Sequence, residues 1–425
     1  MLATDDSARE SVVKETVGPT ADEIAGGRVV DIIQHGEDVG APIAWRADTL
    51  HVIGDVLAGD DDSYTLHGVP ATGIAGDRRG NLYVLDASLG RVLSYDTAGR
   101  HRATFGNGRG EGPGEIMRGR ILVVGPGDSI WVFDRQLLRF TGFPPGDGVA
   151  RTVALPSSSR QLAGSFAVWN GGFLYQPDVP AATAAVLPMD RPVREPVSER
   201  LATMMNQDSH AIVALSGVEV DTIWSMPAAP VRADTTTETP AWAGPPRTRV
   251  TVHAMRYAPT LRWAQLSDGA IVVADNDRCE FRIVTVDGRE VQRVVRDMPP
   301  IPYGEADRAA WLKVRQEHAD TVTDPFVRSS IRRTIATASF AETVPRISSI
   351  HVDGSDRIWV RVRLEGGPPN ARIDIYRNDG SFLGWLPDMP LPRAFLAKNR
   401  AAYLRADPST DVQQVVVIRY QLGEN

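Results

Sequence analysis

The sequence predicts an all-β fold, a six-bladed β-propeller with one helical insertion. A strand–turn–strand unit recurs along the chain, and its copies are short and separated by turns. The 38 glycines and 30 prolines among 425 residues also indicate frequent turns. Repeated β-rich units of about 40–50 residues are typical of propeller blades. Because such thin sheets bury their faces only against one another, we expect them to close around a common axis.

The repeat begins clearly at residues 77–86, which read Asp-Arg-Arg-Gly-Asn-Leu-Tyr-Val-Leu-Asp. A turn precedes an alternating apolar strand that ends in Asp, and a second strand follows it. We expect the apolar strand to be the inner strand of its blade. Further copies occupy 125–134, 267–275 and 353–362, with weaker ones at 170–176 and 399–404.

The spacing of the six copies predicts two insertions. When the copies are aligned on one apolar position, their spacings are 48, 43, 98, 87 and 44 residues, from Tyr83, Trp131, Leu174, Val272, Trp359 and Tyr403. The first long interval predicts an insertion at 178–247, with outer strands such as 211–215 and a solvated Thr- and Pro-rich loop. The second predicts a helical insertion at 304–342, where apolar residues recur at helical spacing and Asp324-Pro325 suits a helix start.

A seven-bladed propeller is the alternative architecture. Residues 221–226 imitate the apolar strand of the repeat and lie midway between Leu174 and Val272. They lack the glycine turn and the following strand, so we prefer six blades.

One domain accounts for most of the chain. We expect residues 1–44 to be a partly irregular N-terminal extension and 45–425 a single propeller. Residues 49–53 are predicted to form the outer strand of the last blade, beside 414–420. When strands from both ends of the chain pair in one sheet, backbone hydrogen bonds hold the first and last parts of the ring together, and the termini do not fray.

Composition excludes several classes of protein. The 46 Lys and Arg against 53 Asp and Glu give a net charge of −7, which lacks the basic footprint of a nucleic-acid-binding protein. The single cysteine, Cys279, rules out an intramolecular disulfide framework and a Cys-based zinc site. No apolar run reaches the length of a transmembrane span, so we expect no transmembrane segment. Peripheral attachment to a membrane complex stays open as an alternative.

The first residues carry no recognisable leader. We expect a periplasmic or secreted protein whose leader is absent from this numbering, with a cytoplasmic location as the alternative.

Two motifs resemble a known family. Residues 77–86 with the following strand at 91–96 resemble the NHL-type propeller repeat. The linker 105–115 resembles the G-x-G-E-G-P-G-E turn of bacterial six-bladed propeller proteins, which are largely uncharacterised and often exported or lipid-anchored. The resemblance implies the fold and leaves the activity open, because propellers host many unrelated functions.

Three aspartates that end the apolar strands are candidate metal ligands: Asp86, Asp134 and Asp275. At one mouth of a channel their carboxylates could hold Ca²⁺, and the similar lactonase and gluconolactonase propellers hold a metal in the channel. We prefer the simpler interpretation, in which each accepts backbone N–H bonds in its own turn and no cofactor is bound.

Candidate catalytic residues are Asp275, Asp277, Glu280 and His351. The first three lie in the densest polar cluster beside an apolar strand, and a channel-facing histidine could act as a base. A polar loop and a packed histidine are the alternatives, which we prefer.

The helical insertion offers a candidate docking surface, formed by Trp311, Phe326, Arg328, Arg332 and Arg333. Arginine and aromatic side chains anchor many interfaces, although an insertion that only caps the propeller fits the same residues.

These observations favour a non-enzymatic binding or scaffold propeller, which presents its loops and helical insertion to a protein, a glycan or a small molecule. The alternative is a metal-dependent hydrolase or lactonase that uses carboxylates at the channel mouth.

Overall fold

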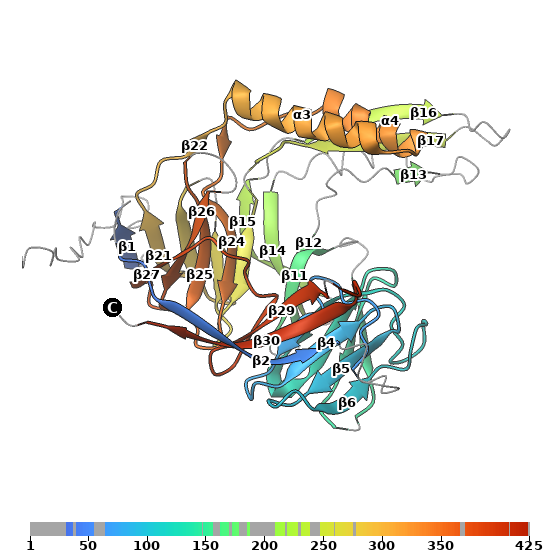
Figure 1. Ribbon diagram of the computed structural model, residues 1–425, viewed down its shortest axis with the longest axis vertical. Coiled ribbons are helices and arrows are strands. Elements are labelled where there is room, and N and C mark those ends of the chain that lie inside the picture. Colours follow the sequence, from blue (N-terminus) through green and yellow to red (C-terminus); the bar gives the residue numbers. More distant parts are fainter. Residues whose placement is uncertain are drawn as a thin grey trace, which may run out of the picture.

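Antiparallel sheets make up most of the computed structural model (Figure 1). The structure describes residues 31–36, 40–54, 64–146, 148–155, 162–169, 172–177, 185–187, 209–216, 219–227, 231–238, 247–258, 260–274, 278–365, 370–407 and 409–423. All strands, helices and contacts named for this protein lie within these ranges.

Five sheets in this part of the chain have four strands each. They are β3 (Ile74–Gly76), β4 (Leu82–Asp86), β5 (Arg91–Tyr95) and β6 (His101–Phe105); β7 (Gly119–Val124), β8 (Ile130–Asp134), β9 (Arg139–Phe143) and β10 (Arg151–Ala154); β11 (Leu162–Trp169), β12 (Gly172–Pro177), β14 (Ser209–Ser216) and β15 (Glu219–Pro227); β24 (Ile347–Val352), β25 (Ile358–Arg363), β26 (Ala371–Tyr376) and β27 (Phe382–Pro387); and β28 (Ala394–Leu396), β29 (Arg400–Ala406), β30 (Gln413–Leu422) and β2 (Trp45–Ile53).

One further sheet has five strands. It contains β18 (Arg262–Gln265), β19 (Ile271–Ala274), β20 (Glu280–Val284) and β21 (Glu290–Arg296), with β1 (Asp31–His35) added in parallel to β21. The propeller arrangement is therefore confirmed, with five regular four-stranded blades among the described residues where we expected six. Residues 221–226, on which the seven-bladed alternative rested, are part of β15 at the edge of its sheet and do not start another blade.

The first strand of each sheet lies nearest the axis. Strand β3 contacts β28 on one side and β7 on the other, β7 also contacts β11, and β18 contacts β24. The apolar strands that end in Asp were expected to be the inner strands, and this was wrong: they are the second strands, such as β4 and β8. Second strands are sandwiched between neighbouring sheets on both faces, so almost every residue in them is buried.

The predicted closure of the ring is confirmed. Strand β2 pairs with β30 along its whole length, from Trp45 opposite Leu422 to Ile53 opposite Val415. Ile53 is 1% exposed and packs with Val415 in the core between this closing sheet and the β3–β6 sheet. The second strand of the described chain, β2, and the last, β30, thus share one sheet.

The first insertion contains more regular structure than we expected. Strands β13 (Ala185–Leu187), β16 (Val231–Glu238) and β17 (Arg247–Ala254) form a small separate sheet. Thr235, Thr236 and Thr237, from the tract that we took for a solvated loop, lie in β16, because a run of β-branched residues favours a strand. The expected outer strand at 211–215 is confirmed within β14.

The second insertion is helical, as predicted. Helices α3 (Glu305–Thr321) and α4 (Pro325–Ala336) form a hairpin between β22 (Ile301–Pro302) and β23 (Thr343–Val344). Asp324 caps α4, since its carboxylate accepts the backbone N–H of Val327 at 3.1 Å. In Figure 1 the hairpin lies at the top of the molecule, above the propeller sheets.

The glycine-rich linker at 105–115 connects β6 to β7 and wraps around Arg139 of β9. The Arg139 guanidinium donates to the carbonyls of Glu111 at 2.7 Å, Gly112 at 3.0 Å and Glu115 at 2.9 Å. The carboxylate of Glu115 accepts the N–H of Gly112 at 2.7 Å. The linker is therefore a turn between two sheets that is ordered by an arginine from the second.

Replacing Arg139 with alanine is expected to lower the free energy of unfolding by about 2 kcal/mol, because three carbonyls lose a charged donor. Chemical denaturation followed by circular dichroism measures the change. Arg135→Ala, at an exposed position of the turn between β8 and β9, is the matched control and should change stability little. Equal losses in the two variants would show that the linker does not depend on Arg139.

Candidate functional site

The channel has two ends of different construction. Residues at the ends of the first strands and in the turns after them surround a cavity of about 510 Å³, including Gly76, Val124, Val168, Gln265 and Val352. We call this end the turn mouth. The opposite end, where β18 and β24 begin, lies on the side of the helical hairpin, because β23 leads directly into β24. We call it the insertion mouth.

Hydrogen bonds between sheets brace the turn mouth. Arg78, from the turn after β3, donates to the carbonyl of Ser267 after β18 at 2.7 Å. The backbone N–H of Ser267 donates to the carboxylate of Asp356, from the turn after β24, at 2.9 Å, and its hydroxyl donates to the same carboxylate. Arg79 forms an ion pair with Asp128 at 3.4 Å. Turns from four sheets are thus tied together.

Two of these aspartates occupy strained backbone positions. Asp128 and Asp356 have φ of 62° and 57°, a region that Gly80 and Gly269 occupy in the corresponding turns of other sheets. A left-handed conformation costs a non-glycine residue energy, although Asp tolerates it better than most. The bonds of Asp128 to Arg79 and of Asp356 to Ser267 offset that cost, which gives both a structural role.

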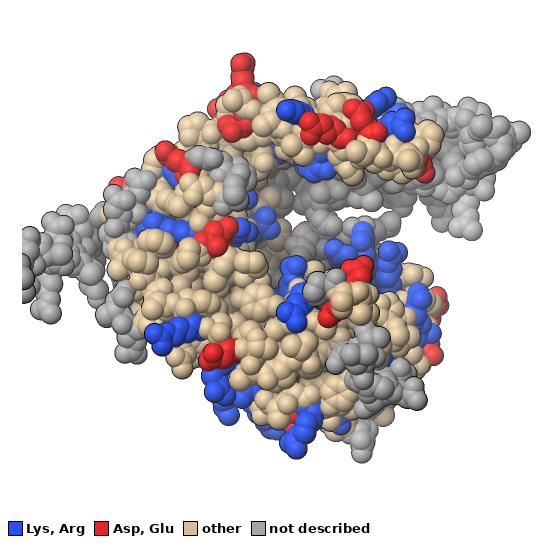
Figure 2. Space-filling model, in the orientation of Figure 1, with Lys and Arg blue, Asp and Glu red and all other residues tan. Residues whose placement is uncertain are grey.

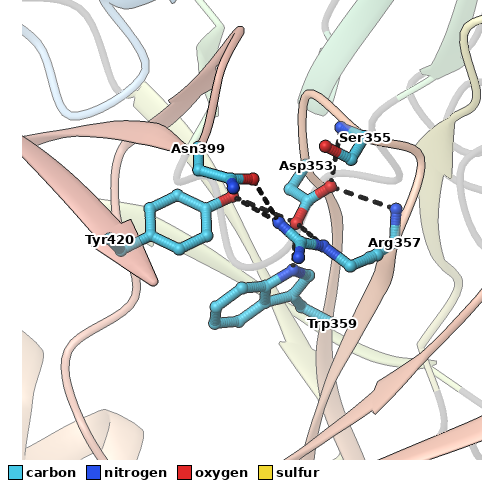
Figure 3. Close-up of polar contacts among 6 residues, drawn as sticks. All are labelled: Asp353, Ser355, Arg357, Trp359, Asn399 and Tyr420. Atoms are coloured by element: carbon cyan, nitrogen blue, oxygen red, sulfur yellow. Dashed lines mark hydrogen bonds and ion pairs between the residues drawn. The ribbon is translucent and has the colours of Figure 1, made fainter. Parts of the chain in front are cut away.

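Asp353 is the centre of the largest polar network in this region (Figure 3). One carboxylate oxygen accepts from Arg357 Nε at 2.7 Å, Trp359 Nε1 at 3.0 Å and Tyr420 OH at 3.0 Å. The other accepts the backbone N–H groups of Ser355 at 2.8 Å and Arg357 at 3.1 Å. Arg357 also donates to Asn399 in the closing sheet at 2.7 Å. The network joins the β24–β27 sheet to the closing sheet.

A similar network surrounds Asp77, which indicates a structural origin. Asp77 accepts the backbone N–H groups of Arg79 and Asn81 at 2.9 and 2.8 Å, and side-chain donors of Asn81 at 2.6 Å and Tyr83 at 3.2 Å. These donors stand at the same offsets along the chain as those around Asp353. The buried aspartate is therefore part of the repeat, even though Arg357 and Asn399 line a surface cavity of about 960 Å³.

The predicted metal ligands are placed unequally. Asp134 is 0% exposed and accepts four backbone N–H groups, from Met117, Arg118, Gln136 and Leu137 at 2.7–3.0 Å. Asp86 is also 0% exposed and pairs with Arg91 at 3.4 Å. Asp275 lies outside the described residues. Within the described part of the chain no three His, Cys, Asp or Glu side chains gather as a metal site.

The predicted catalytic residues do not meet in the described structure. Glu280 begins β20 and forms an ion pair with Arg282 at 2.5 Å. His351 lies on β24 near the turn mouth, with its ring 6.4 Å from that of Phe395. Burial lowers the pKa of His351 to about 4, which keeps the ring neutral at pH 7. Asp275 and Asp277 lie outside the described residues.

The histidine makes stability depend on pH. In the unfolded chain the pKa returns to about 6.5, so the unfolded state binds the proton more tightly. The stabilisation due to neutral His351 is complete above that value and declines as the pH falls towards 4. The midpoint of thermal unfolding should therefore decrease across this range, and less so in His351→Gln. Parallel curves for the two proteins would contradict the assignment.

Part of the predicted docking surface is engaged within the hairpin. Arg328 Nε donates to the carbonyl of Val322 at 2.9 Å, and Arg332 pairs with Asp320 at 3.0 Å. Trp311 packs edge-on against Phe340 at 5.3 Å between ring centroids. Arg333 is half-buried in the last turn of α4, and the side chain of Phe326 lies outside the described part of the structure. Trp311 thus anchors the hairpin, while Arg328 and Arg332 stabilise its turn.

Aromatic residues fix the hairpin to the propeller. The ring centroid of Tyr303 lies 4.7 Å from that of Tyr257 and 5.7 Å from that of Phe340. The guanidinium groups of Arg256 and Arg315 lie 5.1 and 5.5 Å from the ring centroid of Trp311. Burial and the neighbouring Arg315 lower the pKa of Arg256.

Several arginines lie near the insertion mouth. Arg262 opens β18 and is exposed, and Arg361 and Arg363 lie near the end of β25 at the same end of the channel. Arg361 is held by Asp388 through two hydrogen bonds of 2.8 and 2.7 Å. In Figure 2 blue side chains border the hollow between the hairpin and the body below it.

The sequence of β25 contains a signal for these arginines that the repeat pattern does not explain. Second strands β4 and β8 are apolar and end in Asp, whereas β25 reads Ile-Trp-Val-Arg-Val-Arg. Alternation places Arg361 and Arg363 on one face of a strand that is otherwise buried. Charged residues at these positions depart from the repeat, which indicates that they have a role particular to this sheet.

Comparison with protein-family models and with curated proteins finds no match. Among solved structures the chain is similar to a candidate exported protein of Bacteroides fragilis, at 11% identity and a TM-score of 0.46 over 92% of this chain and 99% of that one. A protein of Bacteroides vulgatus from a family of unknown function is 8% identical, with a TM-score of 0.47 over 91% and 98%. A gluconolactonase of Xanthomonas campestris is 11% identical, with a TM-score of 0.35 over 81% and 85%. Such distant likenesses carry no argument about function.

Proposed function

We propose that the protein is a non-enzymatic binding propeller whose partner docks at the insertion mouth. The observation that supports this most is the asymmetry of the channel. Turns of four sheets brace the turn mouth, through Arg78, Ser267 and Asp356 and through the ion pair of Arg79 with Asp128. The hairpin of α3 and α4 is added on the other side. An insertion that adds a surface at one mouth is typical of a binding function.

Removal of the hairpin tests the proposal. Strands β22 and β23 pair Ile301 with Val344 at its base, so residues 304–342 can be replaced by a short turn that leaves the propeller intact. The wild-type protein, this deletion and Arg79→Ala at the turn mouth are compared on a glycan array and in pull-downs. A partner retained by Arg79→Ala and lost with the deletion supports the proposal. A partner that the deletion retains, or a measurable hydrolase turnover, refutes it.

The alternative is a metal-dependent hydrolase, and it depends on Asp275. The Asp134 carboxylate already accepts hydrogen bonds from four backbone N–H groups. Few of its lone pairs are therefore free to coordinate a cation. Elemental analysis of purified protein decides between the two functions. Stoichiometric metal that is lost in Asp275→Ala would favour the hydrolase.

We also propose that the five-stranded sheet is a sixth blade. Strand β18 lies against β24, and Gln265 at its end lines the turn mouth with the ends of the other first strands. It therefore has the position of a first strand. For the compartment we keep the extracytoplasmic proposal, which cell fractionation of the native host tests. None of the described helices is long and apolar enough to cross a bilayer.

A further inference from the structure

Given the proposed function, we propose that the insertion mouth binds the carboxylate or phosphate group of a small ligand through Arg262, with Arg363 as its neighbour. The anion site rests on the proposed docking face, but a test can disprove the anion site without disproving the docking face.

No described residue uses the N–H donors of Arg262. It is the first residue of β18, its side chain is exposed, and among the described residues it makes no hydrogen bond or ion pair. A guanidinium presents five N–H donors in a planar fork that fits two oxygens of a carboxylate or phosphate. An arginine that served only the fold would be expected to use some of these donors within the protein.

Arg363 supplies a second charge at the same end of the channel, because β18 contacts β24 and the start of β24 pairs with the end of β25. This residue ends β25 and donates from one Nη to the carbonyl of Pro345 at 2.6 Å, which fixes the side chain without neutralising it. Arg361, two residues earlier, is already held by Asp388 at 2.7 Å. We therefore assign the ligand to Arg262 and Arg363 and leave Arg361 as a structural ion pair.

The surroundings favour an anion. Partial burial lowers the pKa of Arg262, although part of its side chain remains exposed to solvent. Burial, and after it the charge of Arg262, lowers the pKa of Arg363, and no carboxylate opposes this. Two guanidinium groups that are partly desolvated and close enough to repel remain charged at pH 7. A bound oxyanion removes the repulsion and replaces the missing water.

Citrate and inorganic phosphate are the probes, because together they distinguish a carboxylate from a phosphate ligand. Each is titrated into the full-length protein by isothermal calorimetry, with sodium chloride added to constant ionic strength. We expect the wild-type protein to bind at least one of them, and Arg262→Gln to bind it at least tenfold more weakly. Arg419→Gln, at an exposed position on β30, is the matched control and should bind as the wild type does.

A second measurement separates ligand binding from a structural role. Arg262→Gln relieves the repulsion with Arg363, so the unfolding midpoint of the free protein should stay the same or rise while the response to the probe is lost. A lower midpoint without ligand would overturn the inference, as would the absence of binding by both anions to the wild type. If a partner is lost with the hairpin deletion but neither anion binds, the inference fails and the proposed function stands.

Discussion

Replacing Asp353 with alanine is expected to lower the free energy of unfolding by about 3–5 kcal/mol, because the change leaves the charge of Arg357 without its buried partner. The Asp353 side chain is 0% exposed and that of Arg357 is 18% exposed. Trp359 and Tyr420 each lose an acceptor in the same step. Urea denaturation followed by tryptophan fluorescence measures the loss.

Asp96 provides a matched control for this substitution. It accepts the backbone N–H groups of Ala98 and Arg100 at 2.9 Å each and pairs with the Arg100 side chain, the same local pattern as in the Asp353 turn. These contacts stay within one exposed turn. Asp96→Ala should therefore cost much less stability than Asp353→Ala. Similar losses would mean that the contacts of Asp353 with Tyr420 across the two sheets contribute little.

A chain that begins at residue 55 is expected to lose cooperative folding. The truncation removes β2 from the closing sheet and exposes the edge of β30 from Gln413 to Leu422. It also removes Ile53 from the core, where a buried isoleucine is worth several kcal/mol. Thermal unfolding and size-exclusion chromatography should show a broad transition and association of the chains.

A shorter truncation is the control for the loss of β2. A chain that begins at residue 40 loses β1 but keeps β2 and Ile43, whose N–H donates to the carbonyl of Trp385 at 2.8 Å. We expect this chain to keep a sharp transition, at a lower midpoint because His35 no longer contacts Gly380. Sharp transitions in both truncated chains would show that the fold does not need closure.

The sequence predicted the elements with strong local signals. Strand β4 is a continuous run of buried residues. The hairpin has apolar residues at helical spacing and a helix start capped by Asp324. Strand β2 is an apolar-containing strand that pairs with β30. Each signal follows from local chemistry. By contrast, β3 and β28 have only three residues each, which is too short for a period to be visible. In these two sheets the longer apolar second strands, β4 and β29, were therefore mistaken for the inner ones.

Other features depend on contacts that the sequence does not encode locally. Strand β1 pairs in parallel with β21, some 260 residues away, and its register from Asp31 opposite Gln292 has no local signal. The candidate site was missed for a related reason. Sequence patterns drew attention to Asp86 and Asp134, which proved to be buried. Arg262 is accessible, and accessibility becomes visible only in three dimensions.

Disulfide trapping across the closing sheet tests the central claim, a ring closed by β2 and β30, most directly. Arg46 and Gln421 are exposed and opposite each other in the register, which is a suitable distance for a disulfide. The native Cys279 is buried, with a pKa raised by burial to about 12, so it should not compete. Under mild oxidation the double variant Arg46→Cys with Gln421→Cys should crosslink rapidly within one chain, and Arg46→Cys with Arg419→Cys should crosslink slowly. Equal rates for the two pairs, or crosslinks only between chains, would contradict the closed ring.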